Sequence, residues 1–170
     1  MRFAVDWNWH QPTSKRRGPA MTGTAPQAIT TSQPPQAEAH SFEVTHVDRD
    51  IYAVDIRGHH FQVDQPLEAG GSDLAPTPTE LFAASLATCV AFYAGRFLHR
   101  HSLEQAGLRV RTEFTMATDR PARVASVHVT IIPPPGLTEQ HRAALLAVAS
   151  RCTVHNTLHQ PPEINIKLAS

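Results

Sequence analysis

The stretch from Thr77 to Gly95, TPTELFAASLATCVAFYAG, decides the fold. Thr77 and Glu80 have the spacing of a capping box, and Pro78 occupies the first helical position, so a helix is expected to begin here. The residues that follow are apolar on every side, which is typical of a helix that is covered on most sides. The pattern predicts a buried helix that runs to about His101. Its many small side chains would let another backbone approach closely.

Three short segments before this helix have the alternating apolar and β-branched or aromatic residues of strands. They are Phe42–Val44, Ile51–Ile56 and Phe61–Asp64. The turn Arg57-Gly58-His59 would join the last two in a hairpin. Residues 66–76, which contain Gly70-Gly71-Ser72, predict a loop that leads into the helix.

The segments after the helix show strand and helix patterns in turn. Two strands are predicted, at Leu108–Met116 and Ala122–Ile132, and the second has one apolar face. Thr138 would cap a second helix that runs from Glu139 to about Cys152. The alternation from Glu163 to Leu168 predicts a final strand. This order of elements indicates an α+β fold with largely antiparallel strands.

The first forty residues differ from the rest. Residues 1–40 are rich in Pro, Thr, Ser, Gln and Ala and lack periodicity, so they predict a disordered tail ahead of a domain at 41–170. The two tryptophans, Trp7 and Trp9, are unusual in such a tail. One explanation is that translation starts at Met21, and N-terminal sequencing that finds Met1 or Arg2 as the natural terminus would exclude it.

Charge and hydropathy narrow the class of protein. Lys and Arg number 15 and so do Asp and Glu, so the charge does not suggest a nucleic-acid partner, for which a basic face would be expected. The segment Met1–Pro19 has no apolar stretch suited to a signal peptide, and no run of about 18 apolar residues suggests a membrane span. We therefore expect a cytoplasmic protein with reduced thiols and no membrane partner.

The chain has only two cysteines, Cys89 in the first predicted helix and Cys152 at the end of the second. A free cysteine is often simply buried. In the cytoplasm, however, a cysteine pair is more often catalytic or redox-active than structural. A reactive thiolate needs a nearby cation or helix N-terminus. Cys89 is about two turns from its helix start, so a cation would have to come from elsewhere in the fold or from a partner chain.

Several motifs, in this order along the chain, resemble the OsmC/Ohr family of osmotically inducible proteins and organic hydroperoxide resistance proteins. They are Ile56–His60, Val63–Pro66, Gly70–Asp73 and Pro76–Cys89. The segment Arg151–Leu158 also resembles the second cysteine segment of that family. The resemblance spans Phe42 to Leu168.

The resemblance implies an intertwined homodimer in which antiparallel sheets wrap around central helices. It also implies a peroxiredoxin-like thiol peroxidase with an antioxidant role in oxidative stress. Cys89 would attack an organic hydroperoxide and become a sulfenic acid, and Cys152 would resolve it to a disulfide. A small dithiol of the lipoyl type would reduce that disulfide, with no metal or organic cofactor. A pocket with Phe82, Phe92 and Tyr93 would favour apolar substrates over hydrogen peroxide.

The sequence departs from the family pattern at the start of the helix. In the hydroperoxide-resistance branch a carboxylate directly follows the proline, whereas here Thr79 follows Pro78 and the carboxylate is Glu80. This arrangement resembles a less characterised OsmC-like branch. Glu80 is either catalytic or only a helix cap. Arg49 and Arg57 are both candidates for the arginine that activates Cys89, and no motif chooses between them.

A metal site is one alternative. Cys152, His155 and His159 have the spacing of one helical face, and thiolate and imidazole ligands suit zinc. Against this, Pro161 and Pro162 end any helix there, and no fourth ligand is evident.

Two further alternatives do not use the cysteine pair. A hydrolase would need a nucleophilic serine, but Ser72 and Ser85 lack the Gly-x-Ser-x-Gly elbow. A non-enzymatic module that binds small apolar ligands on the same fold is the second hypothesis. It predicts that Cys89→Ser would leave ligand binding unchanged.

Overall fold

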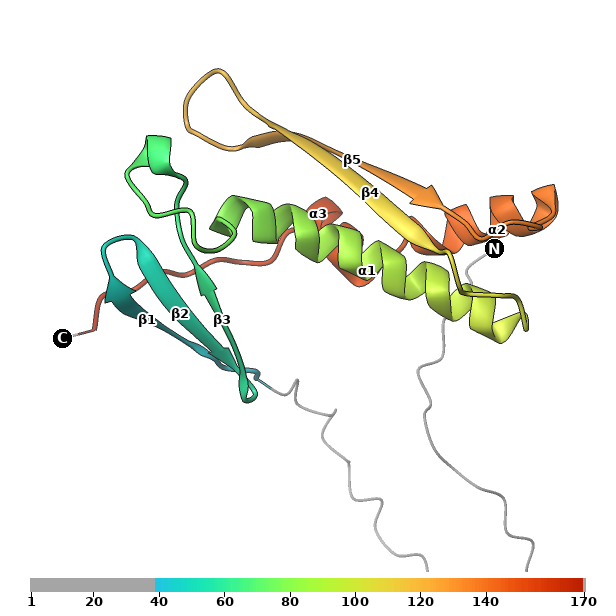
Figure 1. Cartoon of the computed structure of the whole chain (residues 1–170), viewed down its shortest axis with the longest axis horizontal. Helices are drawn as coiled ribbons and strands as arrows, with labels where there is room; N and C mark the ends of the chain where they lie inside the picture. The colour runs from blue at the N-terminus through green and yellow to red at the C-terminus, as the bar shows by residue number, and fades with distance from the viewer. Residues whose placement is uncertain (1–38, 170) are drawn as a thin grey trace, which may run out of the picture. The chain divides into compact units, whose positions relative to one another are not determined.

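The structure is a computed structural model that describes residues 39–169, and His40–Ser170 forms one compact unit. The start at Met21 and nearly all of the tail predicted at residues 1–40 lie outside the described residues. The elements in chain order are β1 (Glu43–Asp48), β2 (Ile51–Ile56), β3 (His59–Val63), the 3-10 turn η1 (Leu67–Ala69), α1 (Pro78–Arg100), β4 (Arg109–Met116), β5 (Val124–Ile132), α2 (Glu139–Ala149) and α3 (Thr153–His159) (Figure 1).

The first three strands form an antiparallel sheet in the order β1-β2-β3, as the strand patterns predict. The β2–β3 hairpin turns at Arg57 and Gly58, both of which have positive φ. Every residue of β1 is exposed, and the buried apolar side chains of the sheet are Ile51, Val54 and Val63. One chain therefore covers little of this sheet.

Asp64 organises the loop that joins this sheet to α1. Its carboxylate is 1% exposed and accepts backbone N–H groups from Gln65, Ser72 and Leu74 at 2.7, 3.1 and 3.1 Å. The hydrogen bond from the Leu74 N–H is the main reason why the pKa of Asp64 lies below its usual range. The loop also needs Gly71, because a Cβ there would lie 1.9 Å from the carbonyl oxygen of Gln65.

The capping box at the start of α1 is confirmed. Glu80 N–H donates to Thr77 Oγ1 at 3.1 Å, and Thr77 N–H donates to Glu80 Oε2 at 2.7 Å. The buried residues of α1 lie along one side: Ala83, Leu86, Val90, Ala94, Phe97 and Leu98. Phe82 and Phe92 are 39% and 56% exposed. The prediction that this helix is buried on most sides is therefore wrong for a single chain. The other elements of the chain cover only one side of α1.

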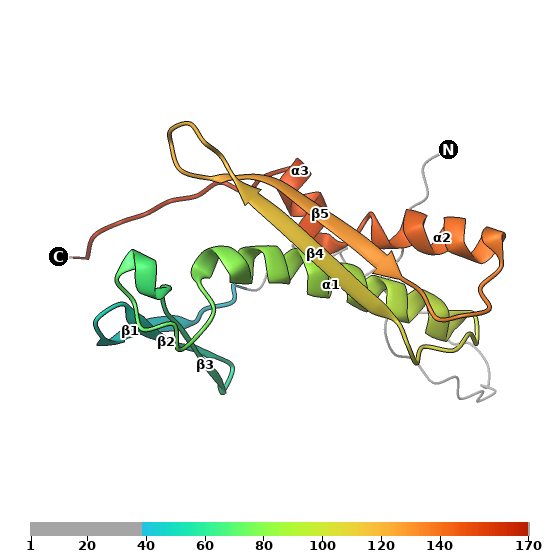
Figure 2. The same ribbon diagram turned by 45° about the horizontal axis from the view of Figure 1, so that its top comes forward.

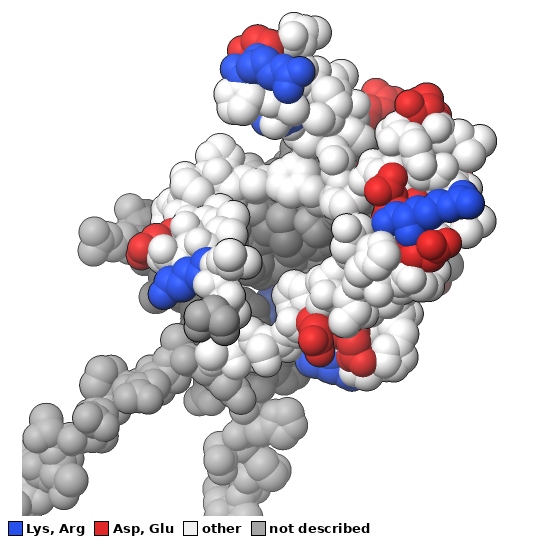
Figure 3. All heavy atoms as spheres, turned by 90° about the vertical axis from the view of Figure 1, so that its left-hand side faces the viewer, with Lys and Arg blue, Asp and Glu red and all other residues white. Residues whose placement is uncertain are grey.

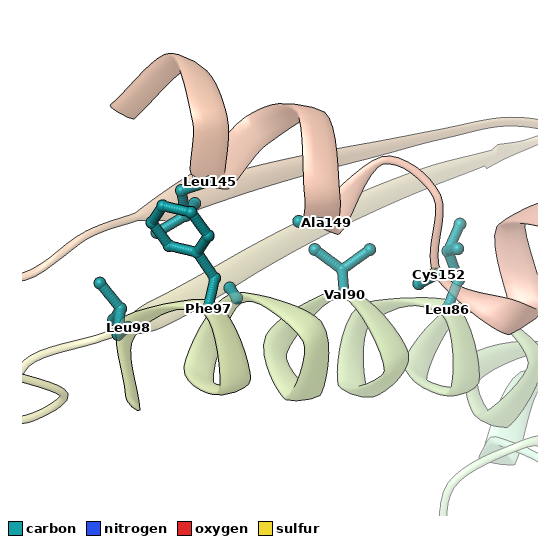
Figure 4. Packing of buried hydrophobic residues seen from close by; sticks show 8 residues of the cluster. Leu86, Val90, Phe97, Leu98, Leu145, Ala149 and Cys152 are labelled. Carbon is teal, nitrogen blue, oxygen red and sulfur yellow. The ribbon is translucent and has the colours of Figure 1, made fainter. Parts of the chain in front are cut away.

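The elements that pack against α1 are α2, α3, β4 and β5 (Figure 2). Strands β4 and β5 pair antiparallel from Arg109↔Ile132 onward, and the predicted apolar face of β5 packs on the core through Val127, Val129 and Ile131. In the centre, α1 contributes most of the buried cluster and α2 adds Leu145 and Ala149 (Figure 4).

Two predictions for the C-terminal part are wrong. The second helix ends at Ala149, so Cys152 is not on it but directly precedes α3. The segment Glu163–Leu168 is not a strand, and Ile164, Ile166 and Leu168 are 75%, 93% and 100% exposed. A strand needs a neighbour to complete its backbone hydrogen bonds, and the described part of this chain provides none there.

By length and composition alone α1 could cross a membrane, and it is the only such helix among residues 39–169. The core helix of a soluble protein meets the same test, and α1 packs on four other elements.

On the face in Figure 3, acidic and basic side chains are interspersed among uncharged ones. This pattern matches the balanced charge of the sequence.

Candidate functional site around Cys89 and Cys152

Cys89 lies midway along α1, partly buried, and packs against the core cluster that contains Cys152. Its sulfur faces the beginning of α3, because the N–H of Val154 donates to Cys89 Sγ at 3.5 Å. This contact joins residues that are 65 positions apart in the chain. Packing between α1 and α3 therefore decides what the thiol of Cys89 meets.

Cys152 is 0% exposed and occupies the N-cap position of α3. Its side chain comes from the connection between α2 and α3 and lies beside Leu86 of α1 (Figure 4). Burial raises the pKa of the Cys152 thiol above its usual value. The backbone N–H of His155 acts in the opposite direction and lowers this pKa, whereas the adjacent Cys89 thiol raises it. Both cysteines are free thiols, so the structure brings together a half-buried thiol and a fully buried one.

Three side-chain contacts hold the segment around Cys152. The hydroxyl of Tyr93 on α1 lies 3.0 Å from Thr153 Oγ1. The ring Nδ1 of His155 contacts the carbonyl oxygen of Ser150, and Asn156 Nδ2 donates to the carbonyl oxygen of Arg151 at 3.1 Å. The sequence pattern assigned Tyr93 only to a substrate pocket. Its position one helical turn after Cys89 was the available signal for a role beside that residue.

The carboxylate of Glu80 is engaged in the capping box at the start of α1. Cys89 lies nine positions further along the chain, which corresponds to roughly 13 Å along a helix. The structure thus shows the capping role of Glu80, and its catalytic role stays a prediction.

The two arginines that the resemblance suggested lie in the turns of the three-stranded sheet. Arg49 and Arg57 have φ values of 46° and 55°, and neither guanidinium has a hydrogen bond or ion pair among the described residues. A third arginine, Arg96, was not among the predicted candidates; it follows Cys89 by two helical turns on the same side of α1. Its guanidinium carbon lies 5.5 Å from the ring centroid of Phe92.

A shallow apolar depression lies at the first turns of α1, lined by Pro78, Thr79, Phe82 and Val124. Of the three aromatic residues proposed for a substrate pocket, only Phe82 lines it.

The three residues considered as zinc ligands do not come together in the structure. Cys152 is buried toward Cys89, whereas His155 and His159 contact each other, Nε2 to Nε2, at 2.7 Å. Among residues 39–169 no group of three metal-ligating side chains gathers.

Comparisons with solved structures show the same fold. A putative osmotic stress induced and detoxification response protein from Psychrobacter arcticus has 24% identity and a TM-score of 0.66, over 73% of this chain and 91% of that one. An organic hydroperoxide resistance protein OsmC from Legionella pneumophila has 20% identity and a TM-score of 0.53, over 72% and 91%. An OsmC-like protein of unknown function from Vibrio cholerae has 12% identity and a TM-score of 0.57, over 71% and 94%.

No curated protein matches this chain. The family model described as OsmC-like protein matches residues 70–167, which is more than half of the chain. This match includes α1, both cysteines and all elements that pack around them. The α+β architecture with antiparallel sheets agrees with that of the similar structures. The chain belongs to the OsmC-like protein family.

Proposed function

We propose that this protein is a thiol-dependent peroxidase that reduces organic hydroperoxides through Cys89 and Cys152. The observation that carries the proposal is the meeting of the two thiols at the first turn of α3. Similar structures from Legionella pneumophila and Elizabethkingia anophelis are named organic hydroperoxide resistance proteins, which supports the substrate class.

The first step takes place at Cys89, the more accessible thiol. Its thiolate attacks the terminal oxygen of the hydroperoxide, the O–O bond breaks, and the alkoxide leaves as an alcohol after taking a proton. Cys89 is then a sulfenic acid. The N–H of Val154 holds the sulfur toward α3, so the oxidised group forms beside the residue that is to react next.

The second step uses Cys152. Its sulfur attacks the sulfur of Cys89, the S–O bond breaks, and water leaves with the thiol proton of Cys152. The burial of Cys152 keeps it away from the hydroperoxide, so the two cysteines have different roles. A small dithiol of the lipoyl type then reduces the disulfide by thiol–disulfide exchange.

The proposal includes a cytoplasmic homodimer. A second copy would cover the exposed side of α1, the sheet β1–β3 and the apolar residues of the segment 163–168. It would also bring Arg49 or Arg57 to the partner's Cys89, which neither arginine contacts within the described part of one chain. Sedimentation equilibrium is expected to give twice the chain mass, and a monomer at micromolar concentration would contradict this arrangement.

The decisive test is intact mass and thiol counting after one equivalent of cumene hydroperoxide, with hydrogen peroxide in parallel. Loss of two hydrogens and of both thiols, faster with the organic peroxide, is expected. Cys89→Ser should abolish turnover, and Cys152→Ser should accumulate a sulfenic acid that dimedone traps. Full turnover by Cys89→Ser would refute the proposal.

A non-enzymatic role in binding apolar ligands is the second candidate. It is favoured by the apolar depression beside Phe82 and by the exposed ring of Phe92. In that case hydroperoxide leaves both thiols unmodified, and an apolar ligand binds equally well to the Cys89→Ser protein.

A further inference from the structure

Two hydrogen bonds join α1 to α3 among the described residues, and both end in the first turn of α3. Tyr93, one helical turn after Cys89, places its hydroxyl 3.0 Å from Thr153 Oγ1. Val154 N–H donates to Cys89 Sγ at 3.5 Å. Thr153 directly follows Cys152, so the Tyr93 hydroxyl holds the residue next to one cysteine from the helix that carries the other.

The position of α3 depends on such contacts, because α3 has only seven residues. A helix of that length is not stable by its own backbone hydrogen bonds. On the side of α2, the segment is attached by His155 to the carbonyl of Ser150 and by Asn156 to the carbonyl of Arg151. Both of these contacts remain within residues 150–156. The Tyr93–Thr153 contact is a polar contact between side chains that fixes the segment on α1, beside the apolar packing of Cys152 and Val154 in the core cluster.

We propose that Tyr93 is a positioning residue for the closure of the Cys89–Cys152 disulfide. Its hydroxyl bonds to Thr153 and acts through that residue, which keeps Cys152 in line with Cys89. The inference deepens the proposed function and rests on it for the order in which the cysteines react. Loss of the hydroxyl lets the first turn of α3 move, so closure slows while the reaction of Cys89 with its first oxidant does not.

Closure can be measured without any hydroperoxide. The reduced full-length protein is mixed with one equivalent of dithiobis(nitrobenzoate). Attack by Cys89 releases one coloured thionitrobenzoate and leaves a mixed disulfide on Cys89. Attack by Cys152 on the sulfur of Cys89 then breaks that bond, closes the protein disulfide and releases the second thionitrobenzoate. The rate of the second release therefore reports closure alone.

The variants separate the hydroxyl contact from packing. Tyr93→Phe removes only the hydroxyl, Thr153→Val removes its partner at similar volume, and Thr153→Ser keeps a hydroxyl. Tyr52→Phe is the matched control, because Tyr52 is the chain's other tyrosine and lies on β2. We expect the second release to slow roughly three- to tenfold in Tyr93→Phe and in Thr153→Val, as the loss of one hydrogen bond would give.

The first release should be unchanged in these variants, and Thr153→Ser and Tyr52→Phe should behave as wild type. The double variant Tyr93→Phe/Thr153→Val should be no slower than either single one. An unchanged second release in both single variants, or equal slowing by Thr153→Ser and Thr153→Val, overturns the proposal. If both single variants slow the second release but wild type does not consume cumene hydroperoxide, the proposed function fails and the positioning role of Tyr93 stands.

Discussion

The surroundings of α1 and the sheet β1–β3 differ in how completely one chain buries them. Around α1, Leu98, Ala149 and Cys152 are 0% exposed. In the sheet, all of β1 is exposed, and Val44 and Val47 are 49% and 51% exposed. The first region has the close packing of a protein interior within a single chain. Cover by a second copy, as in the proposed homodimer, would explain why strands with so few buried side chains persist.

The largest expected effect tests the packed region. Leu98→Ala removes a fully buried side chain and leaves a cavity, so the free energy of unfolding should fall by about 2–5 kcal/mol. Leu67→Ala is the control, because Leu67 is 70% exposed and should cost within about 0.5 kcal/mol. Urea denaturation followed by circular dichroism measures both. Equal costs would mean that the region around α1 is no better packed than the exposed loop.

The next prediction concerns the loop that connects the two regions. The pKa of Asp64 is lowered in the folded state, so its contribution to stability is present above the usual value of 3.8 and is lost as pH falls through the lowered value. Asp64→Asn should therefore destabilise the protein at neutral pH, because an amide nitrogen cannot accept the N–H groups that the carboxylate holds.

Urea denaturation between pH 7 and pH 2 measures this effect. The stability difference between wild type and Asp64→Asn should shrink on the acidic side of pH 3.8. Asp119→Asn is a suitable control, because Asp119 is exposed and pairs with Arg123 at the surface. A stability difference that stays constant down to pH 2 would show that the Asp64 carboxylate is not what holds the loop.

The smallest effect is expected at the start of α1. Thr77→Ala removes the side chain that accepts the Glu80 N–H, at a cost of about 1 kcal/mol. Thr77→Ser should recover most of this, since serine caps equally well. Thermal denaturation resolves the difference, and a Thr77→Ser protein as unstable as Thr77→Ala would contradict the capping role.

Local features were predictable because their causes lie within a few residues. The capping box of Thr77 and Glu80 formed as expected, and the apolar face of β5 packs on the core. The segment Glu163–Leu168 shows the limit of such patterns. Its alternation is that of a strand, but a strand also needs a neighbour, which lies beyond the reach of a local pattern.

By itself, the sequence determined where α1 begins, the alternation of the strands and the presence of just two thiols in an OsmC-like chain. Only the tertiary structure decided which side of α1 is covered, that Cys152 occupies the N-cap position of a third helix, and that Val154 and Tyr93 connect this helix to the neighbourhood of Cys89. The physical reason is range. Capping and alternation act over a few residues, whereas contacts between residues 60 or more positions apart depend on how complete elements pack together.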